Sequence, residues 1–151
     1  MEVPMRDYQR ELVYRWENTL PTGKSLPFEL IKPYVHKVWH DMGLKYPPLV
    51  QPLPKNTTTK LGDANRNVVR FPVNGATEQT ILHELAHSMT THTDGIGHQH
   101  NGVFVGVYMT LMEKYLNVPA LLMFASAKAH GVNFEPFAKP RITDDHHLYV
   151  G

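Results

Sequence analysis

The sequence lacks cysteine, long apolar runs and an excess of charge of either sign. Without cysteine among its 151 residues, the chain can form neither disulfides nor thiolate metal sites, so any metal must be bound by histidine, aspartate or glutamate. The longest apolar run covers residues 118–127, whereas a membrane helix needs roughly 20 residues. The formal net charge is +1 and the basic residues are scattered, so no nucleic-acid footprint stands out.

The N-terminal residues 1–7 have no apolar core like that of a signal peptide. Together with the absence of a membrane segment and of cysteine, this predicts a cytoplasmic protein without membrane attachment. The chain is expected to form one domain, 1–151, which is large enough to bury roughly 68–70% of its unfolded surface without help from a metal. No feature of the sequence indicates an oligomeric state.

One stretch, residues 81–89, carries a motif whose spacing demands a specific chemistry. His83 and His87 are four residues apart and Glu84 follows the first of them, in the pattern HExxH. On a helix the two imidazoles lie about 40° apart and can reach one divalent ion. Glu84 lies about 100° from His83, close enough to hold a water molecule at the metal without being a ligand itself.

The remainder of the same helix supports this interpretation. Its apolar residues fall on the side opposite the histidines: Ile81, Leu82, Leu85, Ala86 and Met89. Even with 10 histidines in the chain, chance gives only about 0.03 matches to the bare motif. The alternative is a pair of histidines that are solvated on a polar helix face.

The remaining pattern predicts an α+β domain. Helical periodicity covers five segments: 5–19, 27–43 with Pro33 as a kink or a start, 77–91 with Asn74 or Thr77 as N-cap, 103–116, and 119–130. A short edge strand is expected at 49–51, and a hairpin with strands at 57–61 and 67–71 around the loop 62–66. We expect three or four helices to pack on a small, mainly antiparallel sheet, with a metal cleft between the sheet edge and the motif helix.

Segment 67–71 leads directly into the motif helix, which gives it two possible functions. As an edge strand it would bind an extended peptide substrate through backbone hydrogen bonds. As an ordinary interior strand it would not be accessible.

We expect the third metal ligand to lie downstream of the motif. The candidates are His92, Asp94, His98, His100 and Glu113. His92 is too close to His87 to fold back easily, and Glu113 falls at the far margin of the apolar face of its helix. His98 and His100 both stand in a glycine-containing loop that can wrap around a metal. A further cluster, Asp144-Asp145-His146-His147, either binds metal or is a solvated segment near the terminus.

The segment His83-Glu84-Leu85-Ala86-His87, followed by His100-Asn101-Gly102-Val103-Phe104 at the start of a helix, resembles the small intracellular gluzincin-like metallopeptidases, including the SprT-like group. The opening of the chain, residues 5–17, resembles a family of small metallohydrolases from actinobacteria and their phages. In such proteins HExxH is followed by a third histidine in the pattern H-G-x-x-F. The resemblance implies a zincin-like fold with zinc bound by His83, His87 and His100. It departs from the family at Asn101, where glycine is frequent.

The sequence and the resemblance together predict a zinc-dependent metallopeptidase that acts on a peptide or protein substrate. Glu84 would be the general base that takes a proton from water and passes it to the leaving amine. The alternatives are a zinc-stabilised binding or regulatory module without catalysis, a phage or host regulator that binds a partner, and a histidine-rich storage protein. An intact Glu84 favours the enzyme, because none of the alternatives needs it. No motif identifies the substrate.

Overall fold

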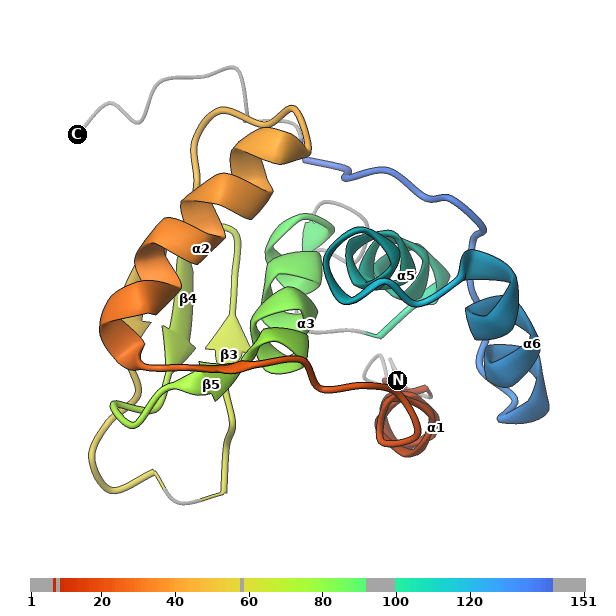
Figure 1. The fold of residues 1–151 in the computed structure, drawn as a ribbon, viewed down its shortest axis with the longest axis horizontal. Coiled ribbons are helices and arrows are strands. Elements are labelled where there is room, and N and C mark those ends of the chain that lie inside the picture. Colours follow the sequence, from red (N-terminus) through yellow and green to blue (C-terminus); the bar gives the residue numbers. More distant parts are fainter. Residues whose placement is uncertain (1–6, 8, 58, 92–99, 143–151) are drawn as a thin grey trace, which may run out of the picture.

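The computed structural model describes residues 7, 9–57, 59–91 and 100–142, and helix α3 lies at the centre of their fold (Figure 1). Helix α5 packs on one side of α3, and the sheet together with α2 lies on the other side. The helices are α1 (Arg10–Glu17), α2 (Phe28–Asp41), α3 (Glu78–Ser88), α5 (Gly102–Leu116) and α6 (Ala120–Ala129). The strands are β1 (Ser25–Leu26), β2 (Leu49–Pro52), β3 (Asp63–Ala64), β4 (Val68–Phe71) and β5 (Ala76–Thr77). None of these helices is long and apolar enough to cross a membrane.

The main sheet has three strands in the order β2-β4-β3. Strand β2 runs parallel to β4, with Leu49 opposite Val68, and β3 runs antiparallel to β4. A separate antiparallel pair joins β1 to β5. The predicted α+β class with a small, mainly antiparallel sheet is confirmed, and so is the edge strand at residues 49–51. The parallel pairing of β2 with β4 is a feature that the sequence pattern did not predict.

The interpretation of segment 67–71 as a substrate-binding edge is wrong. Strand β4 is the central strand, with β2 on one side and β3 on the other, so both of its edges are already paired. The interior alternative is the one that the structure contains. The free edge next to the motif helix belongs to β3 instead, because β3 contacts α3 and is last in the strand order.

The first strand of the predicted hairpin also lies elsewhere, at residues 63–64 instead of 57–61. The reason is a tight turn at Asn65, whose side-chain Oδ1 accepts hydrogen bonds from the backbone N–H groups of Asn67 and Val68. This turn sets the register in which Asp63 lies opposite Arg70. The two side chains then form a bidentate ion pair at 2.7 and 2.5 Å, which no alternation of apolar residues would reveal.

Helix α2 begins just after Pro27 and contains Pro33, so the alternative start at Pro33 is wrong. Its four buried side chains face strand β2 and helix α3: Ile31, Val35, Val38 and Trp39. Their spacing of three and four residues is the pattern that predicted the helix. The buried positions of α2 therefore agree with the apolar pattern of the sequence. That pattern did not decide where the helix begins.

The start of α3 is fixed by the small sheet that β5 forms with β1. Thr77 is the N-cap, because its Oγ1 accepts a hydrogen bond from the N–H group of Thr80 at 3.2 Å. The alternative cap, Asn74, lies on the far side of Gly75. At Gly75 the backbone has φ +102°, and a Cβ there would lie 2.1 Å from the carbonyl oxygen of Leu26, so only glycine fits.

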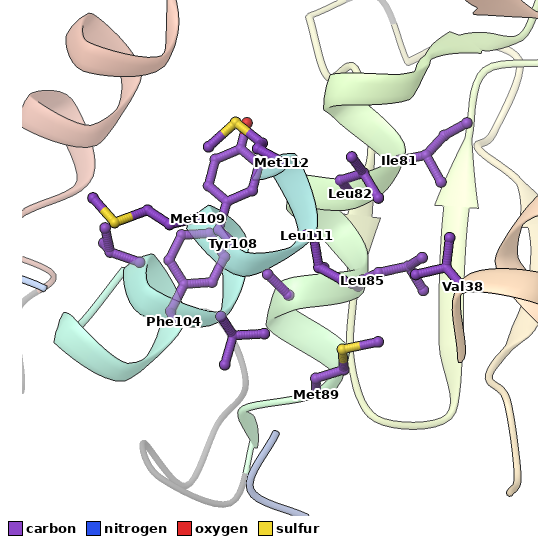
Figure 2. Packing of buried hydrophobic residues seen from close by; sticks show 14 of the residues in the cluster. Val38, Ile81, Leu82, Leu85, Met89, Phe104, Tyr108, Met109, Leu111 and Met112 are labelled. Atoms are coloured by element: carbon purple, nitrogen blue, oxygen red, sulfur yellow. The ribbon is translucent and has the colours of Figure 1, made fainter. Parts of the chain in front are cut away.

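The core is densest where α3 packs against α5 (Figure 2). Leu82 and Leu85 of α3 and its C-cap residue Met89 are fully buried, as are Phe104 and Leu111 of α5. At about 25 cal/mol per Å² of apolar surface, each such side chain stabilises the fold by roughly 1.5–3 kcal/mol. The motif helix is therefore held rigidly by packing, and this packing includes its histidines, because the ring of Phe104 stacks on His87 at 4.2 Å.

Candidate metal centre

Three histidines that are distant in the sequence meet beside α3. His83 and His87 belong to α3, and His100 stands two residues before α5. The Nε2 atom of His100 lies 3.2 Å from that of His87 and 3.3 Å from that of His83. All three side chains are buried. The predicted ligands are thus brought together, and the histidines of the motif are not solvated on a polar face.

The spacing of these nitrogens fits a tetrahedral zinc site. With Zn–N distances of about 2.0–2.1 Å, two ligand atoms of a tetrahedron lie about 3.3 Å apart. The Nδ1 atoms of His83 and His100 contact carboxylate oxygens, which only accept hydrogen bonds, so each Nδ1 carries the proton and each Nε2 keeps a lone pair. Lone pairs at this separation repel one another unless a metal ion lies between them or one ring donates a proton to its neighbour. The donor set therefore matches zinc in both geometry and chemistry.

Glu17, the last residue of α1, orients the ring of His83. Its Oε2 accepts hydrogen bonds from Nδ1 of His83 at 2.9 Å and from the hydroxyl group of Tyr108 at 2.6 Å. Burial alone would raise the pKa of Glu17, but the hydrogen bond and charge of His83 lower it below its ordinary value. Burial opposes a charge on His83, yet Glu17 outweighs it and raises the pKa of His83. Protons would therefore compete with a metal for Nε2 of His83 up to a higher pH than for an ordinary imidazole.

Asp7, in the segment before α1, orients the ring of His100 as Glu17 orients that of His83. Its Oδ2 accepts from Nδ1 of His100 at 2.5 Å, and its Oδ1 accepts from the backbone N–H of the same residue at 3.2 Å. Gln9 adds a third contact by donating from Nε2 to the carbonyl oxygen of His100 at 2.8 Å. Burial, helped by the neighbouring charge of His83, lowers the pKa of His100, which favours the neutral ring that a metal needs.

Glu84 lies beside the ligands but is not one of them. Only 7% of the residue is exposed, and a Cβ at Gly62 would lie 3.0 Å from its Cγ, so the loop before β3 covers it closely. Burial, reinforced by the negative charges of Asp63 and Glu17, raises the pKa of Glu84 to about 7. A carboxyl group with this pKa can take up and release a proton near neutral pH.

The cleft over the histidines is bounded by α1, α3 and β3. A cavity of about 300 Å³ is lined by the three histidines and Glu84, by Asp63 and Ala64 of β3, and by Asp7, Arg10 and Tyr14. The ring of Tyr14 stacks on His83 at 6.0 Å and meets His100 edge-on at 5.3 Å. The cleft therefore lies between the sheet edge and the motif helix, as predicted, and α1 forms a third wall.

Glu113, the one other candidate ligand among the described residues, does not join this cluster. Glu113 is exposed, and its carboxylate accepts a hydrogen bond from the N–H of Ala120 at the start of α6. The segments that contain His92, Asp94 and His98, and the cluster Asp144-Asp145-His146-His147, lie outside the described residues.

Sequence reasoning missed Asp7, Glu17 and Tyr14 as parts of the site. A signal was present: Asp7, Arg10, Tyr14 and Glu17 follow one another at spacings of three, four and three residues. Such spacing places polar side chains along one side of a helix. The same spacing is equally typical of a solvated helix face. Only the fold shows that these side chains contact His83 and His100, two of the candidate metal ligands.

Comparison with known proteins does not identify this arrangement of side chains. A scan against protein-family models, a search of curated proteins and a search of solved structures each found no match. The case for function therefore depends on the side chains themselves.

Proposed function

We propose that the protein is a zinc-dependent hydrolase that cleaves peptide bonds. The observation that carries this proposal is the convergence of the Nε2 atoms of His83, His87 and His100 next to the buried carboxyl group of Glu84. Three neutral imidazoles leave a fourth position open in a tetrahedral zinc site, which is the arrangement of catalytic and not of structural zinc. When bound, zinc polarises a carbonyl group and lowers the pKa of water from 15.7 towards about 7.

The residues of the chain divide the remaining work. Glu84 accepts a proton from the attacking water and delivers it to the leaving amine, since its pKa of about 7 suits both steps near neutral pH. Glu17 and Asp7 hold the rings of His83 and His100 through their Nδ1 protons, so that Nε2 faces the cleft. The wall formed by Tyr14 limits access of bulk water to the ligands.

The substrate would lie along β3. This strand is at the edge of the sheet, and both of its residues line the cavity over the histidines. An extended peptide that pairs with β3 would bring its backbone past His83 and Glu84, and it would bind through main-chain hydrogen bonds with broad sequence tolerance.

A zinc-stabilised binding module is the second candidate, because three buried histidines would also serve a purely structural site. The environment of Glu84 favours the enzyme. A structural site gains nothing from a buried carboxyl group that is not a ligand, and burial of such a group costs free energy.

The substitution Glu84→Gln separates the two candidates. It keeps the size of the side chain and removes the base, so the variant should bind zinc like wild type and lose peptide cleavage by at least about a hundredfold. Glu113→Gln is the matched control and should keep both properties, since Glu113 is exposed and remote from the cluster. Equal cleavage of a peptide library by wild type and Glu84→Gln would refute the mechanism. Cleavage by neither protein would favour the module.

A further inference from the structure

A second cavity, of about 390 Å³, continues the metal cleft away from two of the three histidines. It contains His83 and Glu84 in its lining but neither His87 nor His100, so it extends on the Glu84 side of the metal centre. The two cavities share four lining residues: Arg10, Tyr14, His83 and Glu84. A substrate that occupies both cavities must therefore pass these four side chains, with its scissile bond close to them.

Two cations from different elements line this second cavity. Arg10 comes from α1, and Lys60 comes from the loop before β3. The two carboxylates in the same lining are largely buried: Glu17 accepts bonds from His83 and Tyr108, and Glu84 lies beneath the loop. The cations are the charged groups of this cavity that remain open to a ligand.

Arg10 is held at the cleft chiefly by Tyr14, while Asp7 and Glu11 attract its charge from beyond ion-pair distance. Its guanidinium carbon lies 5.6 Å from the centre of the Tyr14 ring, and its Nε donates to the Tyr14 hydroxyl at 3.5 Å. Within the described part of the chain it forms no ion pair, in contrast to Arg15 on the same helix and to Arg70 on β4. A guanidinium group has five N–H donors in a planar fork that matches a carboxylate, so most of this capacity is available.

Lys60 is only weakly engaged. It lies 3.5 Å from Asp63, whose two oxygens already accept the closer bonds of Arg70 at 2.7 and 2.5 Å. Its side chain is 58% exposed, and it also lines a neighbouring cavity along β3. A ligand carboxylate in the second cavity can therefore be approached by Lys60 without breaking a strong native contact.

We propose that the cleft selects substrates that carry a carboxylate on the Glu84 side of the scissile bond, bound by Arg10 and Lys60. This inference rests on the proposed function, since it names the substrate class of the same site. The carboxylate is either an aspartate or glutamate side chain or the free C-terminus of the peptide. Both present the same planar, doubly accepting group to a guanidinium fork.

Binding to a zinc-loaded Glu84→Gln protein tests this without requiring turnover. The probes are a blocked heptapeptide of alanine and glycine with one central glutamate, its glutamine counterpart, and an uncharged heptapeptide with either a free or an amidated C-terminus. We expect a carboxylate peptide to bind about five- to tenfold more tightly than its neutral counterpart. Whichever pair shows the difference identifies the source of the carboxylate.

The assignment to Arg10 and Lys60 is tested in the same background. Arg10→Gln should abolish the preference and Lys60→Gln should reduce it. Arg15→Gln is the matched control on the same helix and should keep the preference, because Arg15 is exposed and pairs only weakly with Glu11 at 3.8 Å. Equal affinities within both peptide pairs, or a preference that survives Arg10→Gln, would overturn the inference. If Arg10 confers the preference but the wild-type protein cleaves no peptide, the carboxylate-binding site is supported and the proposed function is contradicted, so the two failures are distinguishable.

Discussion

Helices α3 and α1 contribute to the same centre in different ways. In α3 all residues from Ile81 to Ser88 are buried, and the helix is held by the sheet on one side and by α5 on the other. In α1 only Val13 and Trp16 are buried. What α1 adds is a series of polar contacts from its own residues and the segment before it, made by Asp7, Gln9, Tyr14 and Glu17 to His83 and His100.

This difference shows that supplying candidate ligands and fixing the orientation of their rings are separate tasks, performed by different parts of the chain. Packing positions the backbone of α3, but an imidazole can still rotate about its side-chain bonds. The carboxylates of Glu17 and Asp7 fix two of the three rings and their tautomers. If the proposed metal binds, α3 determines its position, and α1 with the segment before it determines how tightly it is held.

The largest expected effect comes from removing a ligand of α3. His83→Ala leaves two imidazoles and should weaken zinc binding by about a thousandfold or more, measured by competition with a chelator of known affinity. The control is His40→Ala, because His40 is exposed on α2, where it contacts the carbonyl of Leu44 and the ring of His36. Unchanged zinc affinity in His83→Ala would remove the basis of the metal centre.

A smaller effect is expected from the supporting helix. Glu17→Gln keeps the shape of the side chain but removes its charge, and it should weaken zinc binding by about 10- to 100-fold. Glu11→Gln on the exposed face of α1 should leave the affinity unchanged. If both variants bind zinc as wild type does, α1 is only a cover, and the distinction drawn between the two helices is wrong.

The smallest effect concerns the stability of the motif helix. Thr77→Ala removes the N-cap acceptor for the N–H of Thr80 and should lower the free energy of unfolding by about 1 kcal/mol. Thr77→Ser keeps a hydroxyl group and should retain most of the stability in urea denaturation. A loss as large in the serine variant as in the alanine variant would assign the effect to packing of the threonine methyl group.

Local patterns predicted α3, α5 and the pairing of His83 with His87, because HExxH and the apolar spacing act within one or two helical turns, whereas His100 was singled out by the family resemblance. They did not predict that β4 is interior, since its partner β2 lies about twenty residues upstream and pairs in parallel. They also missed Glu17 and Asp7, which meet their histidines across 66 and 93 residues. The spacing of residues along the chain does not reveal contacts between residues so distant in sequence. The tight turn at Asn65 was not predicted for another reason. The β-prone residues indicated a longer loop at 62–66, whereas the side chain of Asn65 accepts two backbone hydrogen bonds and thereby forms a shorter turn.

Anomalous scattering at the zinc absorption edge, from crystals of the zinc-loaded protein, tests the central claim most directly. The account predicts one dominant peak per chain, about 2.0–2.1 Å from the Nε2 atoms of His83, His87 and His100, with Glu84 beside it and not coordinated. A peak held by His98 in place of His100, a peak at Asp144-Asp145-His146-His147, or no peak between the three rings would contradict it.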